Sequence, residues 1–169
     1  MAEDNRTLDN NIRVASASIT SLSIFVALSA AIMGFLVSRE SLEFQYNAAV
    51  ISSGCLMLAI VLFLIAIEFF ILCIYHCEHI GFFGLLGSCA YGLGVMFMVV
   101  GISVALAAFQ VKTLSYIFLS FALLGYLAFY GIRTVKLGRE DYLGIRLAAR
   151  MSYILVIATG YGFLITLGG

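Results

Sequence analysis

The sequence predicts an all-α protein, a polytopic helical bundle integral to a membrane, and three observations lead to this fold class. Of the 169 residues, 63% are hydrophobic and only 11% are charged, whereas soluble proteins carry about 25% charged residues. Five long apolar runs follow one another, separated by polar segments. The longest segment without such a run, 133–150, is too short to bury a core of its own. We therefore expect a single transmembrane domain over residues 1–169.

The five runs are expected to form five transmembrane helices, because a helix needs about 20 apolar residues to cross a bilayer. They cover residues 14–37, 48–75, 80–109, 114–132 and 147–167. The first run follows a polar segment, and its length and the acidic start of that segment argue against a cleaved signal peptide. Short connections place consecutive helices antiparallel and side by side. The number of spans falls to four if one run is re-entrant.

Lys and Arg residues fall mainly on one side of the predicted membrane. Seven of them lie in the N-terminal segment or after the fourth run: Arg6, Arg13, Arg133, Lys136, Arg139, Arg146 and Arg150. Only Arg39 and Lys112 lie on the other side. Because cytoplasmic loops carry the excess of Lys and Arg, we expect the N-terminus in the cytoplasm. We expect a multi-pass protein of the plasma membrane, although the same count would hold in an organelle membrane.

Glu68 is the only charged residue within the second run. It lies seven residues before Tyr75, so it sits roughly 10 Å from that end of the helix, too deep for a carboxylate to reach water unaided. The residues on its helix face are apolar or aromatic, so a polar partner must come from another helix or another subunit. Three interpretations remain open: a structural bond or ion pair, an ion or proton site, and a protonated acid that faces lipid.

Small and hydroxyl-bearing residues form one stripe of the first run. The stripe contains Ser16, Thr20, Ser23, Ala27, Ala30, Ala31 and Gly34. Such a stripe either allows close helix packing or lines a hydrated conduit. Glu40 and Glu43 follow this run on the outer side. In a ring of identical subunits these carboxylates would concentrate cations at a pore mouth, and the alternative is that they are solvated loop charges.

The third run is predicted to be the central helix, because small residues mark two of its faces. Gly87, Gly94, Gly101 and Ala108 follow one another at intervals of seven residues. The second face carries Gly81, Gly84, Ser88 and Gly92. Small residues let neighbouring helices approach closely. We therefore expect the third run to contact neighbours on two sides.

Two further groups of residues are candidates for binding. Thiols and imidazoles gather after the second run, at Cys73, His76, Cys77 and His79. A second ligand pair at the usual zinc spacing is missing, so we expect packing thiols or an acylated cysteine, and no metal or cofactor. The basic residues of the second group are Arg133, Lys136, Arg139, Arg146 and Arg150. They are expected to contact anionic lipid headgroups or a cytoplasmic partner.

The function we predict is a homo-oligomeric membrane channel or transport protein for a small inorganic ion, with Glu68 as the ion or proton site. The alternative is a non-catalytic accessory subunit of a larger membrane complex. An enzyme is not expected, because the sequence offers no nucleophile-and-base pair, phosphate loop or paired acids. Nine basic residues balance nine acidic ones, so nothing indicates a nucleic-acid partner. The expected partners are the bilayer and either further copies of the chain or other subunits.

Overall fold

The computed structural model describes residues 2–38, 46–75, 80–109, 111–136 and 143–168, and it confirms the all-α class. Its five helices are α1 (Ala2–Ser38), α2 (Tyr46–Tyr75), α3 (Ile80–Ala108), α4 (Lys112–Lys136) and α5 (Leu143–Gly168). The bounds of α2 to α5 differ from the predicted runs by at most four residues. The first helix is longer than predicted, because the polar N-terminal segment continues the helix back to Ala2.

Four of the five helices are long and apolar enough to cross a membrane. These stretches are Ile12–Ser38, Tyr46–Tyr75, Gly81–Ala108 and Gly144–Leu167. The apolar stretch of α4, Lys112–Ala128, is shorter. Length and composition therefore support a membrane protein, and the choice between four and five spans stays a prediction.

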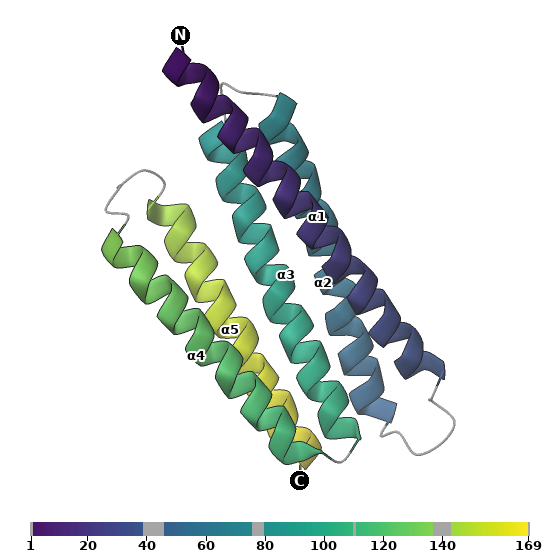
Figure 1. The fold of residues 1–169 in the computed structure, drawn as a ribbon. Helices are drawn as coiled ribbons and strands as arrows, with labels where there is room; N and C mark the ends of the chain where they lie inside the picture. The colour runs from purple at the N-terminus through teal and green to yellow at the C-terminus, as the bar shows by residue number, and fades with distance from the viewer. Residues whose placement is uncertain (1, 39–45, 76–79, 110, 137–142, 169) are drawn as a thin grey trace.

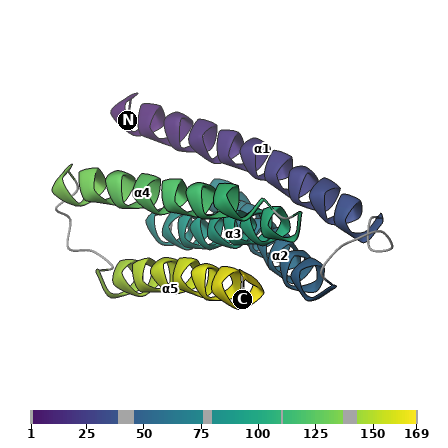
Figure 2. The ribbon, with the colours of Figure 1, turned by 90° about the horizontal axis from the view of Figure 1, so that it is seen from below.

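The helices form an elongated bundle in which α3 lies between α1 and α2 on one side and α4 and α5 on the other (Figure 1). Consecutive helices run in opposite directions, as their short connections predict. The chain therefore begins at one end of the bundle and finishes at the other. Seen from below, α1 and α5 lie on opposite sides of the molecule (Figure 2).

The closest helix pair is α2 and α3, where bulky side chains of α2 lie against glycines of α3. A Cβ added at Gly94 would lie 2.6 Å from the Phe63 ring, and one at Gly101 would lie 3.0 Å from Leu56. The Ser52 hydroxyl also donates to the carbonyl oxygen of Gly101, with an oxygen-to-oxygen distance of 2.7 Å. The seven-residue glycine repeat of α3 is thus the groove that receives α2.

The opposite side of α3 receives α5 in the same way. A Cβ at Gly92 would lie 2.5 Å from the hydroxyl oxygen of Tyr153, and one at Gly160 of α5 would lie 2.8 Å from Val100. The Tyr153 hydroxyl donates to the carbonyl oxygen of Cys89 at 3.0 Å. The prediction that the third helix is central and contacts neighbours on two sides is therefore confirmed.

The α1 helix packs along α2 through buried residues that recur every seven positions: Ala15, Leu22, Ser29 and Leu36. Seven-residue spacing keeps one face of a helix against its partner. An aromatic pair aligns the two helices along their lengths, because Phe25 of α1 stacks on Phe63 of α2 with ring centroids 5.7 Å apart. The small-residue stripe of α1 takes no part in this contact, and its residues are exposed on the surface of the bundle.

Ser29 is the one polar residue of this seam, and Ser29→Ala is expected to stabilise the protein by about 1 kcal/mol. The residue is fully buried, and its Oγ has no hydrogen-bond partner within the described part of the chain. A buried unsatisfied hydroxyl costs about 1–3 kcal/mol, and alanine removes it with little change in shape. Thermal unfolding in detergent would measure the gain, with Ser18→Ala as the control because Ser18 bonds the carbonyl oxygen of Val14 at 2.9 Å. A lower midpoint for Ser29→Ala than for the wild type would contradict the prediction.

Candidate functional site

A cleft of about 770 Å³ lies between α1 on one side and α4 and α5 on the other. Its floor is α3, which contributes six of the fourteen lining residues. The cleft arises because α1 packs along α2 and touches α3 only marginally, so a face of α3 between α1 and α4 stays uncovered. A volume of this size falls within the roughly 300–1,000 Å³ of small-molecule sites.

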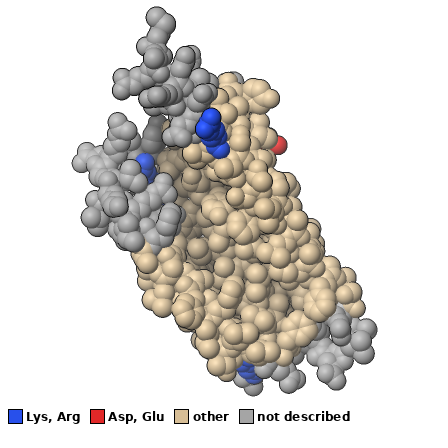
Figure 3. Space-filling view, viewed as in Figure 1, with Lys and Arg blue, Asp and Glu red and all other residues tan. Residues whose placement is uncertain are grey.

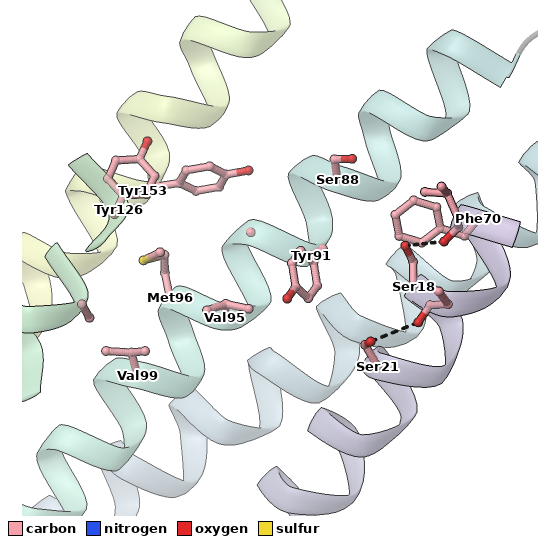
Figure 4. A pocket seen from close by; sticks show the side chains of 14 residues that line it. Ser18, Ser21, Phe70, Ser88, Tyr91, Val95, Met96, Val99, Tyr126 and Tyr153 are labelled. Carbon is pink, nitrogen blue, oxygen red and sulfur yellow. Dashed lines mark hydrogen bonds between the residues drawn. The ribbon is translucent and has the colours of Figure 1, made fainter. Parts of the chain in front are cut away.

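Six of the lining residues carry hydroxyl groups: Ser18, Ser21, Ser88, Tyr91, Tyr126 and Tyr153. Each serine donates to the carbonyl oxygen four residues earlier in its own helix, at 2.7–3.0 Å. Figure 4 shows Tyr126 and Tyr153 on one side of α3 and the two serines of α1 on the other. These serines keep free acceptor lone pairs, so the cleft is apolar with hydroxyl oxygens at intervals.

The two tyrosines from α4 and α5 are held in place by each other and by backbone carbonyl groups. Their rings pack edge to face, with centroids 5.5 Å apart. The Tyr126 hydroxyl donates to the carbonyl oxygen of Arg150 at 3.4 Å, which is a long bond, while Tyr153 bonds Cys89 as described above. Both rings are buried. They form a rigid wall of the cleft rather than a pair of mobile ligands.

Tyr91 differs from the other hydroxyl-bearing residues of the cleft. Its ring belongs to a cluster of three aromatic rings, with centroid distances of 6.1 Å to Phe25 and 6.3 Å to Phe63, and these two rings stack on each other. Its hydroxyl makes no hydrogen bond to any other described residue, and the side chain is only half-buried. A phenol in a preset position with an unused O–H can donate to an acceptor that enters the cleft.

Charge is absent from the cleft lining and present at one end. All fourteen lining residues are uncharged. Arg13 is exposed on α1 next to the lining residue Val14, and Arg150 is half-buried on α5, three residues before Tyr153. Figure 3 shows blue atoms at two places beside the hollow, at the end of the molecule where the chain begins. Arg146, which is also half-buried, lies one turn before Arg150 on α5.

Glu68 lies away from the cleft, on the outward face of α2. Its side chain is exposed, and its exposed neighbours on this face include Val61, Leu64 and Ile65. Within the described residues it makes no hydrogen bond or ion pair. The face opposite, which includes Phe63 and Ala66, is fully buried against the other helices. A partner for this carboxylate inside the described chain was one of the three open interpretations, and the structure does not provide it.

The predicted pore residues of α1 also face outward. Ser16, Thr20 and Ser23 are exposed and do not line the cleft. The Thr20 hydroxyl donates to the carbonyl oxygen of Ser16 at 3.1 Å, and Ser23 bonds Ile19 in the same way at 3.0 Å. Sequence reasoning missed the neighbouring Ser18 and Ser21, which do line the cleft. The spacing of 14, 17, 18 and 21 places four lining residues on one helix face, and this pattern is the signal that was available.

Several predicted residues lie outside the described part of the chain. They are Glu40, Glu43, Arg139, His76, Cys77 and His79, together with the side chains of Arg133 and Lys136. Cys73 is described and buried, and a Cβ at Gly84 of α3 would lie 3.7 Å from its Sγ, so this thiol packs against α3. No group of three His, Cys, Asp or Glu residues in the described chain is placed to hold a metal ion.

The chain was compared with protein-family models, with curated proteins and with solved structures. None of the three comparisons found a match.

Proposed function

We propose that the protein is a homo-oligomeric membrane channel or transport protein for a small ion, with Glu68 as the ion or proton site. One observation carries the proposal: a carboxylate deep in an apolar helix is exposed on the protomer surface and has no partner among the described residues. A charged side chain that faces lipid costs several kcal/mol, and membrane proteins place such groups toward a partner or a water-filled path. Further copies of the chain would supply that environment.

The outward face of α1 supports the same proposal. Phe25 stacks on Phe63, and α1 and α2 run antiparallel. Thr20 lies five residues before Phe25, and Glu68 lies five residues after Phe63, so the two sit at about the same depth. A hydroxyl-bearing stripe and a carboxylate at one depth are the groups that coordinate a cation or carry a proton. We propose that these two faces border the conduit between subunits.

The experiment measures particle mass and ion flux on the same preparations. The mass of the nanodisc-held protein reports the number of copies, and proteoliposomes report cation and proton flux. Glu68→Gln is expected to lower flux by about ten- to a hundredfold, the equivalent of losing one interaction with a charged group. Glu68→Asp keeps the charge and is the matched control, which should retain most of the flux.

Two outcomes would overturn this proposal. A monomer without flux, purified only together with other proteins, would favour the alternative of an accessory subunit. An oligomer whose flux is the same in the wild type and Glu68→Gln would remove Glu68 from the ion path.

A further inference from the structure

The cleft beside α3 combines an uncharged interior with basic groups at one end. The interior offers apolar walls and hydroxyl oxygens, and no lining residue is charged. Arg13 directly precedes the lining residue Val14 on α1, and Arg150 precedes the lining residue Tyr153 by three residues on α5. This distribution matches a molecule that has a long apolar part and an anionic head. A soluble anion fits less well, because it has no apolar part to cover the apolar walls of the cleft.

We propose that the cleft binds one anionic phospholipid, with an acyl chain along α3 and the phosphate beside Arg150. Guanidinium groups bind phosphate oxygens through charge-assisted hydrogen bonds. Arg150 is half-buried, and it belongs to a helix long and apolar enough to cross a membrane, so its charge gains from an anionic partner at the membrane surface. This inference goes beyond the proposed ion path and does not depend on it.

Tyr91 gives the proposal a further contact at a suitable depth. The Tyr153 ring packs on Gly92, the residue next to Tyr91, and Arg150 precedes Tyr153 by three residues, or about 4.5 Å of helix. Arg150 therefore lies about one turn closer than Tyr91 to the end where the chain begins. In a phospholipid the ester carbonyl groups lie about one such step below the phosphate. The Tyr91 hydroxyl, which has no bond to another described residue, would donate to an ester carbonyl oxygen.

The deeper part of the cleft fits an acyl chain. Beyond Tyr91 its lining consists of Val95, Met96 and Val99 from α3, with Ala122 from α4. These side chains offer only apolar atoms and the sulfur of Met96. An acyl chain gains dispersion contacts there, and the open side of the cleft lets a lipid enter from the bilayer without unfolding the bundle.

The headgroup is tested with delipidated full-length protein in detergent, to which dioleoylphosphatidylglycerol or dioleoylphosphatidylcholine is added. Native mass spectrometry counts the lipid bound per chain. We expect one phosphatidylglycerol to bind about tenfold more tightly than phosphatidylcholine, and we expect Arg150→Gln to remove most of this preference. Lys112→Gln, at the opposite end of the bundle, is the matched control and should change nothing. Inorganic phosphate should not displace the lipid, because it lacks the apolar part.

The acyl chain is tested by filling the cleft from α1. Ala17→Phe places a ring in the cleft, while Ala27→Phe places one on the exposed outer stripe of the same helix. We expect Ala17→Phe to lower lipid binding about tenfold or more and Ala27→Phe to leave it unchanged. The thermal midpoint of both variants shows that each is folded.

Three results would overturn the proposal. The first is equal binding of the two lipids, which would show that Arg150 does not distinguish an anionic headgroup from a neutral one. The second is equal loss with Arg150→Gln and Lys112→Gln, which would show general surface attraction. The third is a lipid-free dimer that dissociates with Ala17→Phe, which would assign the cleft to a helix of a second copy.

Discussion

Replacing Gly94 by leucine is expected to destabilise the protein by about 3 kcal/mol or more, because the α2–α3 seam has no room for a side chain there. A Cβ would lie 2.6 Å from Cε1 and 2.7 Å from Cδ1 of Phe63. The Phe63 ring cannot retreat, because it is fully buried and stacks on Phe25. A thiol-reactive dye that detects exposure of buried Cys55 and Cys73 would follow thermal unfolding. We expect the midpoint to fall by roughly 6–12 °C.

Gly54→Leu is the matched control for this experiment. Gly54 lies on the outward face of α2, and nothing comes within 4 Å of a Cβ added there. Its replacement should change stability by no more than about 0.5 kcal/mol. Combining Gly94→Leu with Phe63→Ala should recover part of the loss, because alanine vacates the space that the leucine needs. If Gly94→Leu and Gly54→Leu unfold at the same temperature, the α2–α3 contact described here is wrong.

The position of α3 was predictable from the sequence, and its partners were not. Gly87, Gly94 and Gly101 recur on one helix face, which indicates a close neighbour whatever that neighbour is. The partner is α2, whose Phe70, Phe63 and Leu56 lie against these three glycines. Spacing on one helix cannot name the helix it meets, because phenylalanine and leucine are as compatible with lipid as with a protein groove. What the sequence does not contain is which helix lies beside the glycine face of α3, and how the two are aligned along their lengths.

The sequence also did not indicate which face of α1 is buried. Its small-residue stripe looked suitable for packing, yet the structure buries the face that carries Leu22, Ser29 and Leu36. Bulky side chains fill the space between α1 and α2 and gain more dispersion contacts than small ones. The exposed stripe around Thr20 and Ala27 is therefore left for lipid or for another chain. The sequence alone could not show which of these two faces of α1 packs against α2.

The cleft could not be predicted from any one segment. Its lining comes from all five helices, and its volume depends on how far α1 stands from α4. Glu68 was found by its charge in an apolar run, which is a local signal, whereas Tyr91 has no local feature that separates it from other membrane tyrosines. What distinguishes Tyr91 is its unused hydroxyl beside a hollow, and this property exists only after folding.

Tyr153→Ala is expected to destabilise the protein by about 3–5 kcal/mol, the usual cost of truncating a buried aromatic residue. Tyr153 is only 2% exposed and is the largest of the fully buried side chains. It anchors α5 to α3 through its ring on Gly92 and its bond to the carbonyl oxygen of Cys89 at 3.0 Å. Leu155→Ala is the control on the same helix, because Leu155 is 69% exposed and should contribute little. The thiol-dye unfolding assay would measure both variants.

Two further variants separate the ring from the hydroxyl. Tyr153→Phe keeps the ring and loses one hydrogen bond, which between membrane helices is worth about 0.6 kcal/mol on average, so it should cost far less than alanine. Gly92→Leu should destabilise the wild type, because a Cβ there would lie 2.5 Å from the Tyr153 hydroxyl oxygen. In the Tyr153→Ala background the same leucine should stabilise, because it fills the space that the ring has left. This reversal of sign is a strict test, because a protein in which α5 does not dock its Tyr153 ring on Gly92 would show the same sign in both backgrounds.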